Sequence, residues 1–129
     1  MEIPQDRWLP LIELRMAREG GWESSVRLGP SSEWFSGHFD ECPLLPGVAL
    51  LALAAETVKR QGHQKGRLLE VSGFSGVRFR RLVFPGEELF ISVGAMPPGP
   101  EAELDFQVTC HGNTVVLGVL IVAEKLDGG

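Results

Sequence analysis

The stretch that decides the fold is Val48–Gln61, VALLALAAETVKRQ, which Pro46-Gly47 precedes and Gly62 follows. Proline and glycine before a helix, and glycine after it, are typical start and stop signals, so the stretch predicts one helix. Its first eight residues, Val48 to Ala55, are apolar on every side. A helix of that kind has to be surrounded by other structure. The rest of the chain must therefore supply a layer that wraps around it.

Strand patterns on both sides of the helix predict that this layer is a β-sheet. Before the helix, Ile12–Met16 alternates apolar and charged residues, and Gly20-Gly21 predicts a turn into a second strand, Trp22–Leu28. The strand runs after the helix are Leu68–Phe74, Val77–Arg81, Glu88–Gly94, Ala102–His111 and Thr114–Ala123. The last run places four apolar side chains on one face: Val115, Leu117, Val119 and Ile121. The predicted fold class is α+β, with a curved antiparallel sheet wrapped around one central helix.

Length and composition exclude several classes of protein. With 129 residues, one domain spanning residues 1–129 is expected. Seventeen acidic against twelve basic residues give a net charge of −5, which argues against general nucleic-acid binding. Cys42 and Cys110 have neither a disulfide framework nor metal-ligand spacing, so we expect no metal and no cofactor. The first residues do not resemble a signal peptide and no apolar run spans a bilayer, so a soluble, cytoplasmic protein is expected.

The segment with the most chemically active side chains comes directly before the helix. His38 lies nine residues before Gly47, the expected helix start. The first N–H groups of a helix are unpaired and lie at the positive end of its dipole, so they can polarise a carbonyl oxygen. A histidine near that oxygen can move a proton on the adjacent carbon. The alternative is a loop histidine that makes only structural hydrogen bonds.

Two blocks of the sequence resemble the 3-hydroxyacyl-acyl-carrier-protein dehydratases of fatty-acid synthesis. Gly37-His38-Phe39-x-x-x-Pro43-x-x-Pro46-Gly47-Val48 is similar to the family motif GHFPxxPxxPGV. Val77–Glu87, VRFRRLVFPGE, is similar to the family segment ARFRRPVxPGD, and the likeness in pattern extends from about Ile12 to Lys125. The resemblance implies a hot-dog fold and a homodimer, or a higher even oligomer, with active sites at the subunit interface. It also implies that an acyl-pantetheine chain lies in a tunnel.

The same resemblance assigns roles to individual residues. His38 takes the position of the catalytic histidine, and Gly47 the position whose backbone N–H polarises the thioester carbonyl. The implied substrate-lining residues are Phe39, Pro46, Val48 and Ala52. At the position of Ala52 the family has a glutamate or aspartate, which the partner subunit contributes. Alanine cannot donate a proton, so the resemblance leaves the lyase activity open.

Several residues are candidates for the replacement acid. Glu56 lies one helical turn beyond Ala52 on the same face, where the family usually has glutamine. Asp40 and Glu41 follow the histidine, and Cys42 is close enough in sequence to form a thiolate–histidine pair. Each group also has a purely structural interpretation. Glu56 would form a hydrogen bond at the helix end, the two loop carboxylates would be solvated, and the cysteine would be a small packed residue.

Basic residues gather after the middle of the helix, where seven of the twelve lie between Lys59 and Arg81. A carrier protein is acidic and its phosphopantetheine is anionic, so this cluster favours a carrier-docking surface. The residues assigned to docking are Arg78, Arg80 and Arg81. The alternative is an ordinary solvated face on which arginine stems cover apolar surface.

The predicted function is a dehydratase-like protein that acts on 3-hydroxyacyl chains carried by acyl carrier protein or coenzyme A. The pathway would be fatty-acid biosynthesis or related lipid or polyketide biosynthesis. Two alternatives stay open. One is a hot-dog acyl thioesterase with Glu56 or Asp40 as the base. The other is a non-catalytic acyl-carrier-binding module, or a subunit that pairs with an active relative.

Overall fold

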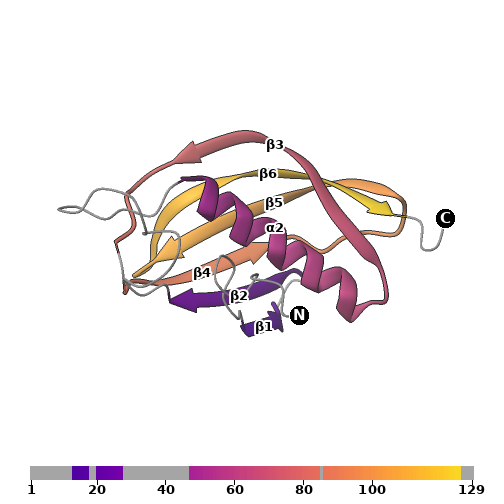
Figure 1. Cartoon of the computed structure of the whole chain (residues 1–129), viewed down its shortest axis with the longest axis horizontal. Coiled ribbons are helices and arrows are strands. Elements are labelled where there is room, and N and C mark those ends of the chain that lie inside the picture. The colour runs from indigo at the N-terminus through magenta and orange to yellow at the C-terminus, as the bar shows by residue number, and fades with distance from the viewer. Residues whose placement is uncertain (1–12, 18–19, 28–46, 85, 126–129) are drawn as a thin grey trace, which may run out of the picture.

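The computed structural model describes residues 13–17, 20–27, 47–84 and 86–125. Its elements are β1 (Glu13–Met16), β2 (Trp22–Arg27), α2 (Gly47–Gln64), β3 (Leu68–Phe79), β4 (Glu88–Val93), β5 (Glu101–Cys110) and β6 (Asn113–Lys125). Figure 1 shows α2 lying along the concave side of a curved sheet. The predicted α+β architecture, one helix wrapped by an antiparallel sheet, is therefore confirmed.

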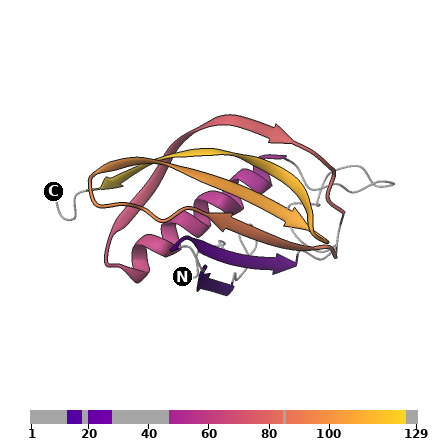
Figure 2. The ribbon, with the colours of Figure 1, turned by 180° about the vertical axis from the view of Figure 1, so that it is seen from behind.

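The sheet has six strands in the order β1-β2-β4-β5-β6-β3, and each neighbouring pair is antiparallel. β1 and β3 are consequently the two edges. Seen from behind, the outer face of the sheet carries no described helix or strand (Figure 2). The β5–β6 hairpin turns at His111 and Gly112, whose φ values of 53° and 79° are both positive. A type I′ hairpin turn requires a positive φ at both of its central residues.

The helix is longer at its C-terminal end than the glycine signal predicted. It runs through Gly62 and ends at Gln64. The chain turns at Gly66, where φ is 71°, and the Arg67 N–H donates to the carbonyl of Gly62 at 2.8 Å. Gly62 therefore allows the returning chain to pack against the helix. A Cβ at this position would lie 2.6 Å from the Arg67 carbonyl oxygen and 2.7 Å from Leu69 Cγ.

Gly62→Ala is expected to lower the free energy of unfolding by about 1–3 kcal/mol, because the new methyl group overlaps backbone and a core leucine. The higher helix propensity of alanine offsets part of this cost. Urea denaturation measures the difference. Gly73→Ala is the control, since the nearest atom to its new Cβ is 3.5 Å away. Equal stabilities of the two variants would contradict the packing argument.

β3 is one continuous strand, whereas the sequence predicted two separate ones, Leu68–Phe74 and Val77–Arg81. Its pairing with β6 is irregular between Val71 and Gly73 and again between Ser75 and Arg78. The glycine in the second irregularity, Gly76, has a φ of 59°. The break between the two predicted strands thus falls at a bulge. Bulges bend a strand, and here they let β3 follow the curve of the sheet.

The core lies between α2 and the concave face of the sheet. The β5–β6 register pairs Leu104 with Leu120, and both side chains are buried. Of the face predicted for β6, Val115 is buried, but Ile121 is 37% exposed. The β6 residues buried beside Val115 are Val116, Leu120 and Val122. β6 is apolar on both faces, so alternation alone did not show which face meets the helix.

Candidate active site

The helix start at Gly47 borders an exposed aromatic ring. A Cβ at Gly47 would lie 2.9 Å from Cε1 and Cζ of Phe79, so the ring packs directly over the glycine. The Phe79 side chain belongs to the end of β3 and is 53% exposed. The first turn of α2 contains no acidic residue. The positive end of the helix dipole is therefore not neutralised by the helix itself and stays available to a polarised oxygen.

One face of α2 is not covered by the described residues. The sheet buries the other side, including Leu50, Leu53 and Val58. Val48 is 62% exposed, and Ala52, at a four-residue interval on the same face, is only partly buried. The expectation that the helix is surrounded is therefore met on one side only within the described part of the chain. The uncovered face carries Ala52, the position at which the sequence resemblance implies an acid in the dehydratase family.

Several predicted site residues fall outside the described residues. These are His38, Phe39, Pro46 and the loop groups Asp40, Glu41 and Cys42. Their roles stay predictions. The structure does bring Gly47, Val48 and Ala52 together on the first turns of α2.

Glu56 forms an ion pair with a residue of its own helix. Its Oε2 accepts a hydrogen bond from Arg60 Nε at 2.8 Å, and its side chain is only 11% exposed. A carboxylate held in such a pair is an acceptor and not a proton donor. For Glu56 to act as the replacement acid, this ion pair would have to break. The structure thus gives Glu56 a structural role that the sequence already offered as the alternative.

The three predicted docking arginines lie in different surroundings. Arg78 and Arg80 are exposed. Arg81 instead donates from Nη2 to Glu87 Oε2 at 2.8 Å, and its side chain is 29% exposed. The guanidinium of Arg81 is therefore occupied by this ion pair. Of these three arginines, Arg78 and Arg80 have no ion-pair partner among the described residues.

Glu87 is the centre of a small polar network that the sequence did not reveal. Its Oε1 accepts from the Phe84 N–H at 2.9 Å, and this bond, together with Arg81, lowers the pKa of the carboxyl. Cys110 Sγ lies 3.5 Å and His111 Nε2 3.7 Å from Glu87 Oε2. Because Glu87 and this pair are far apart in sequence, no local motif signals the cluster.

The three donor atoms of Glu87, Cys110 and His111 lie within 4.8 Å of one another, a spacing that can hold a metal ion. A metal would require the thiolate form of Cys110, but burial raises the pKa of this thiol. Arg81 also already supplies a positive charge to Glu87 Oε2. The network is better explained as a set of polar contacts that hold the segment before β4 against the β5–β6 hairpin.

This network predicts an acid-sensitive stability. The pKa of Glu87 is lowered from 4.5 in the folded state, so the unfolded chain binds more protons as the pH falls. The stabilisation is present above about pH 4.5 and is lost progressively below it. Glu87→Gln is expected to reduce the stability at pH 7 and to flatten this pH dependence, as urea denaturation at pH 7 and pH 4 would show. Glu103→Gln, at an exposed position of β5, should keep the pH dependence of stability of the wild type. The assignment to Glu87 would be contradicted if Glu87→Gln had the same pH dependence as Glu103→Gln.

Solved structures with this architecture define the class of protein. The chain resembles a hypothetical thioesterase of Streptococcus pneumoniae TIGR4 solved with coenzyme A, with a TM-score of 0.69, 14% identity and 89% of each chain covered. It also resembles PaaI of the Escherichia coli phenylacetic acid degradation operon, with a TM-score of 0.68, 18% identity, and 87% of this chain and 82% of that chain covered. The protein has a hot-dog fold, as the sequence resemblance implied. Among the described residues, no helix is long and apolar enough to cross a membrane.

Residues 15–119 match the model of the ApeI-like dehydratases, described as ApeI dehydratase, and the chain belongs to this family. A chain of the dehydratase heterocomplex ApeI:P from Xenorhabdus doucetiae has the same fold, with a TM-score of 0.65, 22% identity, and 88% of this chain and 96% of that chain covered.

Curated relatives confirm the predicted resemblance to the acyl-carrier-protein dehydratases. The 3-hydroxyacyl-acyl-carrier-protein dehydratase FabZ of Listeria welshimeri is 35% identical over 90 residues, which are 66% of this chain and 62% of that protein. The Bacillus cereus FabZ is 33% identical over 92 residues, 63% of this chain and 64% of that protein. The matches thus span less than two thirds of the length of these two relatives.

Proposed function

We propose that this chain is the histidine-bearing subunit of a dehydratase that removes water from a 3-hydroxyacyl thioester on acyl carrier protein or coenzyme A. The pathway would be fatty-acid biosynthesis or related lipid or polyketide biosynthesis. The observation that carries the proposal is the start of α2 at Gly47, with no acid in its first turn and His38 nine residues before it. Membership of the ApeI-like dehydratase family supports the same reaction class.

In this proposal the Gly47 N–H donates to the thioester carbonyl oxygen and makes the C2 proton more acidic. The His38 imidazole takes that proton. The electron pair of the C2–H bond forms the C2=C3 double bond while the C3–O bond breaks. The hydroxyl leaves with a proton as water. In relatives of this type a carboxyl at the position of Ala52 would supply that proton, and in this proposal a carboxyl of the partner subunit supplies it.

We further propose that the protein acts as a dimer. Phe74 and Phe79 on the edge strand β3 are 36% and 53% exposed, and Val48 on the uncovered face of α2 is 62% exposed. An open strand edge beside exposed apolar side chains is the kind of surface that a second subunit covers. Light scattering at micromolar concentration is expected to give about twice the chain mass of 14.1 kDa. A mass of a single chain would contradict self-association of this chain and leave only a dimer with a different subunit.

The partner subunit need not be a second copy of this chain. Two copies would place Ala52 at both sites, so both would lack the family acid. A related hot-dog chain with a carboxylate at that position would complete one site together with His38 of this chain. The Xenorhabdus relative is a chain of a dehydratase heterocomplex, which favours this second arrangement.

An assay with a 2-enoyl thioester tests the proposal in the reverse direction. Hydration removes the absorbance of the conjugated double bond without releasing thiol, and this is the expected result. Release of free thiol instead would identify a thioesterase. Binding of acyl carrier protein with neither reaction, even after addition of an acid-bearing relative, would identify a non-catalytic module. Each of the last two outcomes contradicts the dehydratase proposal.

A further inference from the structure

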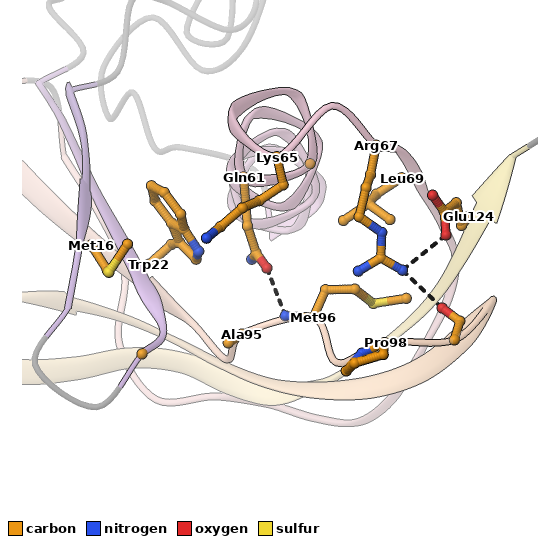
Figure 3. Close-up of a pocket in the computed structure, with 13 residues that line it drawn as sticks. Met16, Trp22, Gln61, Lys65, Arg67, Leu69, Ala95, Met96, Pro98 and Glu124 are labelled. Carbon is orange, nitrogen blue, oxygen red and sulfur yellow. Dashed lines mark hydrogen bonds and ion pairs between the residues drawn. The ribbon is translucent and has the colours of Figure 1, made fainter. Parts of the chain in front are cut away.

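A separate cavity lies at the other end of α2 (Figure 3). It has a volume of about 710 Å³ and lies between the end of α2, the adjoining ends of β1 and β2, and the loop from β4 to β5. Gln61, which lines it, follows Gly47 by fourteen residues, so about 21 Å of helix separates the cavity from the helix start. This cavity is therefore distinct from the proposed dehydratase site. Its size is within the range of small-molecule sites, about 300–1,000 Å³.

Most polar groups of the cavity wall are already bonded. Gln61 donates to the Gly94 carbonyl at 3.2 Å and accepts from the Met96 N–H at 2.7 Å. Arg67 donates to the carbonyls of Pro97 and Gly99, and to Glu124 at 2.9 Å. These bonds fix the loop from β4 to β5 against the helix end. These hydrogen bonds hold the cavity open, so its shape does not depend on a ligand.

Two side-chain hydrogen-bond donors of the cavity lining have no partner among the described residues. They are the Lys65 ammonium and the indole N–H of Trp22. Trp22 is only 8% exposed, but its indole nitrogen is not one of the fully buried atoms, so the N–H remains accessible to a ligand. In Figure 3 both nitrogens point toward the same part of the cavity. Since Arg67 is neutralised by Glu124, Lys65 supplies the net positive charge there.

We propose that this cavity binds a monocarboxylate with a short unbranched apolar chain. The carboxylate accepts hydrogen bonds from Lys65 Nζ and from Trp22 Nε1, and one cation with one neutral donor suits a single negative charge. The apolar chain lies against Met16, Leu69 and Met96, which line the same cavity. Two of these are methionines, whose flexible side chains adapt to a thin aliphatic ligand.

Octanoate is the probe, and titration calorimetry with the full chain is the measurement. Lys65→Gln is expected to weaken octanoate binding at least tenfold, because a charge-assisted bond is lost. Lys59→Gln, which removes an exposed lysine of α2 outside the cavity, is expected to bind like the wild type. Octanol and acetate, which lack the charge and the chain respectively, are each expected to bind much more weakly than octanoate.

A second readout locates the ligand. Octanoate is expected to shift the indole N–H cross-peak of Trp22 in ¹⁵N-labelled protein, and Trp22→Phe assigns that peak by its disappearance. Absence of octanoate binding at millimolar concentration, or equal weakening by Lys65→Gln and Lys59→Gln, would overturn the proposal. Neither measurement uses turnover, so this proposal and the dehydratase proposal fail independently of each other.

Discussion

Ala52→Glu is expected to raise the rate of 2-enoyl thioester hydration by about 10²–10⁴-fold, because it restores the general acid that the sequence resemblance implies at this position. This gain corresponds to roughly 3–5 kcal/mol of transition-state stabilisation. Ala52 is only partly buried, one turn from the exposed Val48, so a longer side chain has room to reach a partner subunit. Burial at the subunit interface would raise the pKa of the new carboxyl, which suits a group that has to carry a proton.

Steady-state hydration rates of wild type and variant measure this gain. Ala55→Glu, a partly buried alanine one turn from Ala52, is the control for a carboxylate merely added to the helix. Packing a glutamate where the interface fits alanine should cost about 1–3 kcal/mol of stability, which thermal unfolding would reveal. A folded Ala52→Glu dimer with no gain over Ala55→Glu would show that position 52 does not face the reacting hydroxyl.

Mixing subunits tests whether the acid and the histidine come from different chains. A chain that carries both Ala52→Glu and His38→Ala has no catalytic histidine and is expected to be inactive alone. In a mixed dimer with wild type, its new carboxyl meets the His38 of the other subunit, so activity should appear. Activity that never exceeds the wild-type background would contradict a shared site.

Glu56→Gln tests whether Glu56 is the replacement acid. The ion pair with Arg60 predicts that this variant keeps wild-type activity. If the wild type is already fast and Glu56→Gln abolishes turnover, the acid has instead moved one turn along the helix.

His38→Ala is expected to abolish hydration of the enoyl thioester while leaving the melting temperature nearly unchanged. The imidazole takes the C2 proton in the proposed reaction, and no other group of the GHF motif can accept a proton. The same hydration assay and a thermal melt give both quantities. His63→Ala, an exposed histidine in the last turn of α2, serves as the control and should stay active. Retained activity in His38→Ala would remove the dehydratase interpretation.

The local sequence predicted most of the fold because its signals are short-range. The fully apolar Val48–Ala55 stretch indicated the central helix, and alternating residues in Ala102–His111 indicated a half-buried strand. Both patterns depend only on the period of a helix or strand, which is a property of the backbone. The structure changed mainly the boundaries, at Gly62 and at Gly76. At both positions the glycine serves packing or a bulge rather than ending an element.

The sequence by itself determined the helix, the strands, the family motif and the absence of a carboxylate at Ala52. Only the tertiary structure decided which side chains form ion pairs with one another and which ones face a cavity. It paired Glu56 with Arg60 and Arg81 with Glu87, and it left Lys65 and the Trp22 indole facing one cavity. Ion pairs and cavities depend on how distant segments meet, and a charged side chain looks the same in sequence whether its partner is a carboxylate or water. The availability of a functional group is therefore a property of the folded chain.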